Sequence, residues 1–201
     1  MKKIGIVVRS FEENLKNFVG CRKEVLDAFQ DYPVGLVLIP IDLSYEQVLY
    51  LTRLCDGVVL TGGDHFTQND FLLVDYLYQQ DIPVLGICLG MQVMALNFGE
   101  GREINVDPIH CQKNNDAHHI IIKSNTLLNS IVKKDRITVN SRHKTGVSQT
   151  QLCVSAKSSD GVIEAVEDKS KRFFLGVEWH PESSLNQYNS LIIDAFIQSL
   201  M

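Results

Sequence analysis

The sequence predicts an α/β fold of three layers, in which helices cover both faces of a central, mostly parallel sheet. Apolar runs of strand length alternate with stretches of helical periodicity through the first half of the chain. These runs are continuously apolar, which is typical of parallel strands buried on both faces. In the second half, short β-type segments separated by polar turns predict an antiparallel extension of the sheet.

The first half of the chain contains the expected β-α units. Its strands are expected at 2–8, 34–39, 57–60 and 83–87. Its helices, expected where apolar residues recur at helical spacing, lie at 19–29, 45–52, 71–78 and 89–96. Asn69 or Asp70 is the expected N-cap of the third helix, and Gly99 the C-cap of the fourth. Because ligands of such folds bind beyond the carboxyl ends of the parallel strands, the site is expected there.

The second half contains the antiparallel extension. Its strands are expected at 118–123, 136–139, 151–156, 161–167 and 172–177, followed by a closing helix at 186–200. The segment from Gly99 to Ala117 is polar and lacks periodicity, which predicts a long loop of the kind that often borders a site. A length of 201 residues suits one domain over 1–201.

Composition excludes several classes of function. The chain has 19 basic and 24 acidic residues, and this net charge of −5 argues against a nucleic acid or an anionic membrane as partner. No apolar run approaches the roughly 20 residues that span a bilayer. Arg9 interrupts the first apolar run too early for a signal peptide. Five cysteines without CxxC pairing predict free thiols and a reducing, cytoplasmic location.

One of these cysteines has the surroundings of a nucleophile. Gly86-Ile87-Cys88-Leu89-Gly90 has the pattern of a nucleophile elbow, in which a strand ends, the chain turns sharply and a helix begins. The two glycines stand where a Cβ would clash in so tight a turn. The helix N-terminus is expected to favour the Cys88 thiolate. The N–H of Leu89 is then placed to donate to an oxyanion beside the sulfur.

A proton carrier is expected at the same edge of the sheet. Trp179-His180-Pro181-Glu182 follows the last apolar strand, so His180 stands at the carboxyl end of a strand as Cys88 does. Glu182 can accept from the other ring nitrogen and hold the tautomer. Each motif alone is commonly a core cysteine or an ordinary strand exit. Both motifs at predicted strand ends indicate a Cys-His-Glu triad.

Together these motifs resemble the class I glutamine amidotransferase superfamily, and within it the stand-alone γ-glutamyl hydrolases of the peptidase C26 group. The resemblance rests on the segments 86–92 and 178–182, and more weakly on 60–64, 139–143 and 160–165. It covers nearly the whole chain. It implies the flavodoxin-like sheet of that superfamily.

The resemblance also implies hydrolysis of a γ-glutamyl amide without a cofactor. Cys88 would attack the amide carbonyl to give a γ-glutamyl thioester. His180 would protonate the leaving amine and then activate water, releasing glutamate. The family's second oxyanion donor falls on Gly63, beside Leu89. Its substrate contacts fall on Gly62, Asp64, Gln92, Ser141, Arg142 and His143.

The departures from the family pattern all concern the leaving-group side. No proline follows Asp64, Lys144 replaces the usual polar residue, and the chain is shorter than most such hydrolases. Arg142 and Lys144 can receive a phosphate, although a solvated charged pair is the plainer interpretation. The preferred substrate is a γ-glutamyl nucleotide amidate such as the γ-glutamyl-CDP-amidate of capsular phosphoramidate synthesis. A small γ-glutamyl amine such as γ-glutamyl-aminobutyrate is the rival.

Two other functions fit the same motifs. The first is a glutaminase subunit that delivers ammonia to a separate synthetase partner, which activity on free glutamine would distinguish. The second is a binding protein on a retired enzyme fold, a class that normally loses the cysteine or the histidine. The expected partner is a small γ-glutamyl substrate, with a second copy of the chain in a homodimer as the candidate protein partner.

A metal site is the remaining alternative, since His110, Cys111, His118 and His119 stand close together in the sequence. Their spacing matches no usual zinc finger. Adjacent strand residues point to opposite faces, so His118 and His119 cannot easily bind one ion. The sequence therefore predicts no metal, and instead a polar rim in which His110 or Arg102 contacts substrate.

Overall fold

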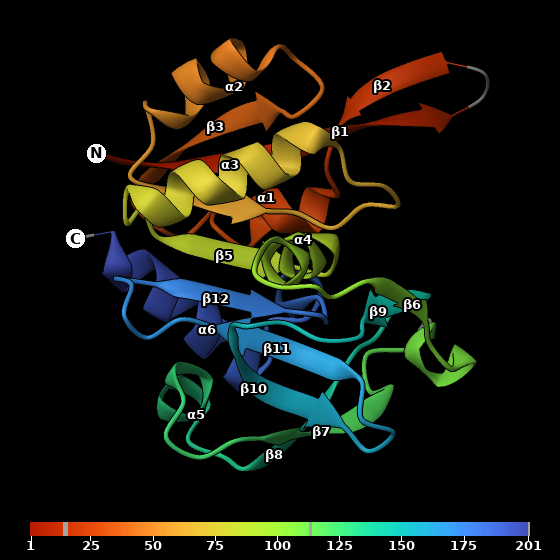
Figure 1. The fold of residues 1–201 in the computed structure, drawn as a ribbon. Helices are drawn as coiled ribbons and strands as arrows, with labels where there is room; N and C mark the ends of the chain where they lie inside the picture. The colour runs from red at the N-terminus through yellow and green to blue at the C-terminus, as the bar shows by residue number, and fades with distance from the viewer. Residues whose placement is uncertain (14–15, 113, 201) are drawn as a thin grey trace.

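The computed structural model describes residues 1–13, 16–112 and 114–200, and a ten-stranded sheet forms its middle layer (Figure 1). The parallel strands are, in order across the sheet, β3 (Val34–Pro40), β1 (Lys2–Glu13), β4 (Gly57–Leu60), β5 (Val84–Ile87) and β12 (Phe174–Val177). The antiparallel strands that follow are β11 (Ile163–Glu167), β10 (Cys153–Ser158), β7 (His118–Ile122) and β8 (Arg136–Val139). The mostly parallel sheet with an antiparallel extension is thus confirmed.

Helices cover both faces of this sheet, which completes the three layers (Figure 1). One face carries α2 (Tyr45–Thr52), α3 (Gln68–Gln79) and α4 (Leu89–Asn97). The other carries α1 (Lys23–Asp27), α5 (Leu127–Val132) and α6 (Gln187–Ser199). The central parallel strands β4, β5 and β12 lie between two helical layers and are buried at every position. This burial explains their continuously apolar sequences.

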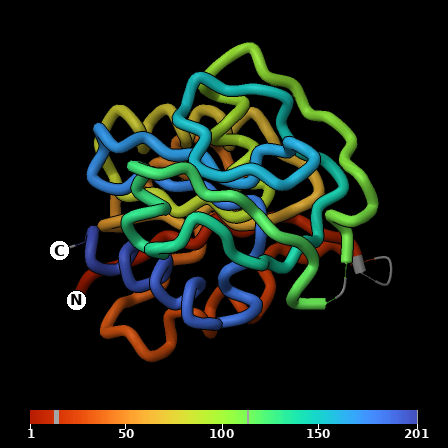
Figure 2. Tube along the Cα trace, turned by 90° about the horizontal axis from the view of Figure 1, so that it is seen from below, coloured from red at the N-terminus to blue at the C-terminus, as the bar shows by residue number. Residues whose placement is uncertain are grey.

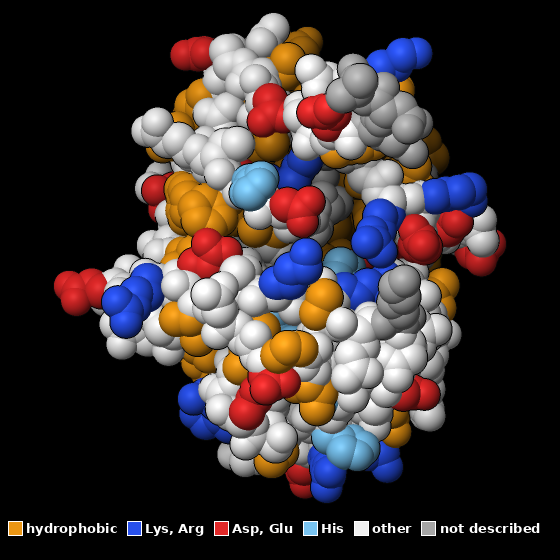
Figure 3. All heavy atoms as spheres, turned by 90° about the vertical axis from the view of Figure 1, so that its right-hand side faces the viewer, with side chains coloured by type: hydrophobic (Ala, Val, Ile, Leu, Met, Phe, Trp, Pro, Cys, Tyr) orange, Lys and Arg blue, Asp and Glu red, His pale blue; other side chains and the backbone are white. Residues whose placement is uncertain are grey.

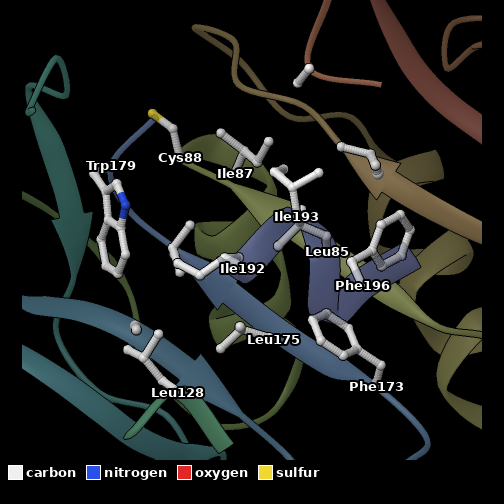
Figure 4. Close-up of a cluster of buried hydrophobic side chains, with 14 of the residues drawn as sticks. Leu85, Ile87, Cys88, Leu128, Phe173, Leu175, Trp179, Ile192, Ile193 and Phe196 are labelled. Atoms are coloured by element: carbon white, nitrogen blue, oxygen red, sulfur yellow. The ribbon is translucent and has the colours of Figure 1, made fainter. Parts of the chain in front are cut away.

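The buried cluster between the sheet and α6 reaches the carboxyl ends of the strands. Phe173 and Phe196 pack at one end of this cluster, and Trp179 lies fully buried at the other (Figure 4). Cys88 lies at the edge of the cluster, with its sulfur turned away from the aliphatic side chains (Figure 4). The core therefore ends where the site begins.

The N-terminus and the last turn of α6 lie at the opposite end of the molecule from the carboxyl ends of the parallel strands (Figure 1), and Figure 2 shows them on the same side of the chain. Short elements frame the carboxyl ends instead: the two-stranded sheet of β6 (Glu103–Asn105) and β9 (Thr145–Val147), and the 3-10 turns η1 (Pro108–His110) and η2 (Pro181–Ser183). The predicted loop from Gly99 to Ala117 is therefore partly ordered by β6 and η1. No helix within the described ranges is long and apolar enough to cross a membrane.

The helix expected at 19–29 is wrong in its first half. Residues Lys16–Gly20 form β2, which pairs antiparallel with the far end of β1, and only Lys23–Asp27 is helical. Val19 is 54% exposed instead of buried on a helical stripe. Stacked rings of Phe11 and Phe18 hold this hairpin, and a cross-strand pair of this kind leaves no helical period in the sequence.

The N-cap of α3 also differs from the expectation. Thr67 is the N-cap, and Asp70 is the third helical residue, whose carboxylate accepts from the Thr67 N–H at 2.7 Å. The same carboxylate holds Arg9 through two hydrogen bonds of 3.0 and 2.7 Å. Asp70 thus joins the start of α3 to the end of the buried part of β1.

Candidate active site

Cys88 occupies a sharp turn between β5 and α4. Its φ of 50° and ψ of −110° are unfavourable for a residue with a Cβ, a conformation that proteins maintain mainly at functional turns. Its N–H donates to the carbonyl of Val177 at 2.8 Å, which ties the turn to β12. The elbow geometry expected from the sequence is present.

The two glycines of the elbow are sterically required. A Cβ on Gly90 would lie 2.1 Å from the carbonyl oxygen of Leu60, and one on Gly86 would lie 2.4 Å from the sulfur of Met94. Both distances are far below van der Waals contact. The absence of both side chains is what lets α4 pack directly on β4 and β5.

His180 lies at the N-cap of η2, beyond the end of β12. Its Nδ1 is 2.7 Å from Oε1 of Glu182, so this nitrogen carries a proton that the carboxylate accepts, and Nε2 carries the lone pair. Asn140 fixes the backbone of His180 from both sides. The Asn140 amide donates to the His180 carbonyl and its Oδ1 accepts from the His180 N–H, each at 2.8 Å.

Gly62 lies beside both the cysteine and the histidine. A Cβ built on Gly62 would lie 3.2 Å from Cε1 of His180 and 3.5 Å from Cβ of Cys88, so both side chains flank this glycine. The next residue, Gly63, faces the side chain of Leu89, at 3.1 Å from its own ideal Cβ. The structure therefore brings the five residues that the sequence placed in the triad and the oxyanion site to one point.

Burial opposes the Cys88 thiolate that the helix N-terminus was expected to favour. Burial raises the pKa of Cys88 well above its ordinary value of 9.0, and the carboxylate of Glu178 raises it further. The N–H of Leu89 lowers this pKa, but the effect is smaller. A buried thiol of this kind becomes nucleophilic when a base takes its proton, and Nε2 of His180 is the base at hand.

We expect Cys88 to be protonated at neutral pH in the free protein. Thiolate absorbance near 240 nm is therefore expected to be equal in wild type and Cys88→Ala from about pH 7 to pH 9, because the raised pKa keeps this proton on the sulfur. The wild-type excess is expected to appear only above that range. A Cys88-dependent absorbance already present at pH 7 would contradict this assignment.

A cleft with two lobes opens at Cys88. The first, which we call the arginine lobe, has a volume of about 750 Å³ and is lined by Arg9, Arg22 and Arg142 together with His180 and Glu182. The second, the glutamine lobe, has a volume of about 630 Å³ and is lined by Gln92, Glu103, His143, Lys144 and Thr145. Cys88, Gly63, Asp64, His65 and Arg142 line both lobes. Figure 3 shows this face of the molecule, with a hollow bordered by basic side chains and a few acidic ones.

Gln92 lies on the inner wall of the glutamine lobe. Both hydrogens of its amide are engaged, by the Thr145 carbonyl at 2.9 Å and by Oε1 of Glu178 at 2.5 Å. Its carbonyl oxygen is therefore the group available to a ligand. Burial and the neighbouring Glu164 raise the pKa of Glu178 well above the usual range of a carboxyl.

Two expected substrate contacts are placed differently from the prediction. Ser141 is fully buried, and its hydroxyl donates to the carbonyl of His110 at 2.6 Å, so it does not line either lobe. His143 forms part of the wall, but its Nδ1 lies 2.8 Å from the Thr145 carbonyl and its Nε2 is buried away from the lobe. Burial lowers the pKa of His143 to about 4. Alternating side-chain direction along 141–143 leaves Arg142 as the member of this segment that lines both lobes.

The sequence analysis did not assign a role to the lining residues Arg9 and Arg22, or to Asn140, which supports His180 from outside the cleft. Arg9 stands directly after the first apolar run, and a charge at the end of a buried strand is a signal that could have indicated it. Asn140 directly precedes the expected Ser-Arg-His contacts. Its two hydrogen bonds to the backbone of His180 join residues 40 positions apart, and local sequence does not reveal such a contact. Arg22 reaches the arginine lobe from the segment before α1, and nothing in its local sequence marks it.

The fold and the site together define a hydrolase of the class I glutamine amidotransferase-like superfamily. The sequence profile of the peptidase C26 family matches residues 64–182, and the chain belongs to this family. It is 29% identical over 216 residues to a glutamine amidotransferase-like protein of Rickettsia prowazekii (strain Madrid E), covering 72% of this chain and 77% of the relative. It is also 29% identical over 143 residues to a glutamine-hydrolyzing GMP synthase subunit of Methanothrix thermoacetophila, covering 71% and 76% respectively.

Solved structures share the fold. A GMP synthase subunit of Thermoplasma acidophilum superposes with a TM-score of 0.75 at 21% identity, covering all of this chain and 94% of its own. The glutaminase domain of Trypanosoma brucei CTPS, solved with bound acivicin, superposes with a TM-score of 0.70 at 19% identity, again over 100% and 94%. At these identities the likeness concerns the fold alone.

Proposed function

We propose that the chain hydrolyses a γ-glutamyl amide through a thioester on Cys88. The observation that carries the proposal is the position of Cys88 at the junction of two lobes, one for each side of the bond to be broken. His180 and Glu182 stand beside it, hydrogen-bonded to each other at 2.7 Å. A nucleophile, a base and an orienting carboxylate are the groups that acyl transfer needs.

The reaction has two halves. His180 Nε2 takes the proton of the Cys88 thiol as the sulfur attacks the side-chain carbonyl carbon, and the N–H groups of Leu89 and Gly63 receive the oxyanion. The C–N bond then breaks as the imidazolium of His180 returns that proton to the departing nitrogen. In the second half His180 takes a proton from water, the hydroxide attacks the thioester, and glutamate leaves as the thiol is restored.

The glutamine lobe fits the glutamyl half of the substrate. The carbonyl oxygen of Gln92 can accept from the α-ammonium group. Lys144, which lines this lobe only, can pair with the α-carboxylate. Asp64 lies at the mouth of both lobes and adds a second acceptor for the ammonium group.

The arginine lobe fits an anionic leaving group. Asp70 neutralises Arg9, but among the described side chains no carboxylate pairs with Arg22 or Arg142, and Arg142 donates to the neutral hydroxyl of Ser183 at 2.7 Å. Two unpaired guanidinium groups in a lobe of about 750 Å³ suit phosphates better than a small neutral amine. The proposed substrate is therefore a γ-glutamyl nucleotide amidate, of which γ-glutamyl-CDP-amidate is the specific candidate.

Arg142→Ala tests the anionic leaving group. We expect kcat/KM on the nucleotide amidate to fall by about 10- to 100-fold, the effect of losing one charge-assisted hydrogen bond. The ratio of kcat/KM for the nucleotide amidate to that for γ-glutamyl-aminobutyrate should fall as well. Lys144→Ala is the matched control, because Lys144 lines the glutamine lobe only. Equal losses on both substrates would remove Arg142 from leaving-group recognition.

A glutaminase subunit is the second candidate, favoured by the similarity to the GMP synthase subunit of Methanothrix thermoacetophila. A panel assay distinguishes the two. The purified chain is incubated separately with the nucleotide amidate, γ-glutamyl-aminobutyrate and glutamine, and released glutamate is measured. The proposal predicts release from the amidate at the highest kcat/KM without any partner. Release from glutamine alone would establish the glutaminase subunit in its place.

A further inference from the structure

Four polar side chains behind the glutamine lobe converge on one point. They come from separate elements: His110 from η1, His118 from the start of β7, His143 from the segment after β8, and Glu164 from β11. One ligand atom from each lies within 4.8 Å of the other three. The side chains of His110 and His143 are each 1% exposed, that of His118 is 7% exposed, and that of Glu164 is 0% exposed. The cluster is therefore enclosed, and it is separate from the triad.

The separations within the cluster match those of ligands around one small cation. Oε1 of Glu164 lies 3.2 Å from Nδ1 of His110, 3.4 Å from Nε2 of His118 and 3.9 Å from Nε2 of His143. Ligand atoms at bond lengths of 2.0–2.1 Å around a tetrahedral zinc ion stand about 3.3 Å apart. The distances from Glu164 are near this value and the other separations lie within 4.8 Å, so the rings would move closer together around a bound ion.

The outer nitrogen of each ring faces an acceptor. Nε2 of His110 lies 3.0 Å from a carboxylate oxygen of Asp160, and Nδ1 of His143 lies 2.8 Å from the Thr145 carbonyl. Nδ1 of His118 lies 3.3 Å from the carbonyl of His119. Each outer nitrogen has hydrogen-bond geometry with its acceptor, and none of the inner nitrogens has it with Glu164. The proton of each neutral ring therefore lies on the outer nitrogen, and the inner nitrogen directs a lone pair at the centre. Metal-bound histidines are held in this way by their surroundings.

The inner atoms have no partners of their own. Within the described part of the chain, no hydrogen bond reaches His110 Nδ1, His118 Nε2, His143 Nε2 or either carboxylate oxygen of Glu164, and all of these atoms are buried. Three lone pairs and a carboxylate are all acceptors, and a buried set of acceptors needs a positive centre. Either a metal ion or additional protons on the rings can supply that charge.

We propose that His110, His118, His143 and Glu164 bind a divalent transition-metal ion, with zinc as the ion that fits best. Three imidazoles and one carboxylate suit zinc, whereas magnesium and calcium favour oxygen ligands. Four protein ligands in an enclosed position leave no open place for water, so the ion is structural. It holds the segment from Arg142 to Thr145, which lines the glutamine lobe, against η1, β7 and β11.

No metal was predicted from the sequence, because only the histidines and the cysteine within residues 110–119 were weighed as ligands. The opposite orientation expected for His118 and His119 is present: His118 faces the cluster, whereas His119 is exposed and lies 2.8 Å from the hydroxyl of Thr138. His143 and Glu164 complete the set from distant parts of the chain. His119 therefore provides a matched control, since it is the same residue type, next in sequence, on the other face of the strand.

Zinc content and zinc affinity test the proposal on the full chain. The chain is stripped with a chelator, reloaded with Zn²⁺, and titrated against a chromophoric chelator, with bound metal counted by elemental analysis. Wild type and His119→Asn are expected to bind one ion per chain with equal affinity. Glu164→Gln removes one ligand without changing its volume, and we expect at least about 100-fold weaker binding. Binding of Co²⁺ should give the intense visible absorption of tetrahedral sites.

A second variant leaves the ligands and the buried cluster intact. Asp160 orients His110 from a partly exposed position, so Asp160→Ala should fold normally and weaken zinc by about 10- to 100-fold. Chelation should lower the Tm of wild type and of His119→Asn, but not that of Glu164→Gln. Wild type that takes up no zinc at micromolar concentration, or Glu164→Gln that binds zinc as tightly as wild type, would overturn the proposal. If wild type takes up no zinc, the positive charge of the cluster comes from additional protons on the histidine rings.

Discussion

Cys88→Ala should abolish glutamate release, with kcat/KM lowered by at least about 10⁴-fold, the effect typical of removing a catalytic nucleophile. The thioester requires the sulfur, and no hydroxyl or second thiol stands in the elbow to replace it. The fold should persist, because alanine keeps the Cβ and fills the same turn between β5 and α4. Initial rates on the best γ-glutamyl substrate and the Tm are the two measurements.

Cys21→Ala is the matched control for this loss. Cys21 also lines the arginine lobe, and its pKa is also raised, mainly by burial, but it lies outside the elbow. We expect its removal to change kcat little. Turnover by Cys88→Ala at a rate near that of wild type would exclude the thioester, and would leave a ligand-binding role on this fold.

Gly90→Ala should destabilise the protein by about 3 kcal/mol, the upper end of what is typical when a new side chain is forced into a closed core. The added Cβ would lie 2.1 Å from the carbonyl oxygen and 2.7 Å from the Cβ of Leu60, so α4 would have to move away from β4. Because α4 begins at Cys88, the same displacement should also disturb the elbow. Urea unfolding monitored through Trp179 gives the free energy of unfolding.

Gly35→Ala is the control for the glycine substitution. Gly35 lies in β3, and the atom nearest to its ideal Cβ is the terminal methyl group of Met1 at 3.3 Å, which can move aside. We expect a change within about 1 kcal/mol, since alanine is compatible with a strand and has lower entropy in the unfolded chain. Equal effects of the two substitutions would show that close packing of α4 on β4 is not what Gly90 provides.

The parts of the fold that could be predicted are those whose neighbours lie close in sequence or whose burial is uniform. β4, β5 and β12 are covered on both faces, and that environment is written directly in their apolar runs. The hairpin of β1 and β2 could not be predicted in this way. Phe11 and Phe18 are exposed by 48% and 43% and stabilise each other across the strands, so no burial pattern marks them.

The same distinction holds within the site. The elbow and the His-Pro-Glu segment are local motifs, and each sets its own geometry: the strained turn at Cys88 and the 2.7 Å contact of His180 with Glu182. The arginine lobe and the histidine cluster are assembled from separate elements. Arg22 reaches the lobe because β2 returns the chain to it, and Glu164 meets His110 only because β11 lies beside η1 in the folded chain. Such contacts depend on strand order, which the sequence did not predict.

A thioester on Cys88 can be detected by how it partitions between water and a second nucleophile. The wild-type chain is given two γ-glutamyl amides with different leaving groups, each in the presence of hydroxylamine, and the products γ-glutamyl hydroxamate and glutamate are quantified. Both substrates should pass through the same thioester on Cys88, so we expect one ratio of hydroxamate to glutamate for both. A ratio that changes with the leaving group, or glutamate release with no hydroxamate at any hydroxylamine concentration, would contradict it.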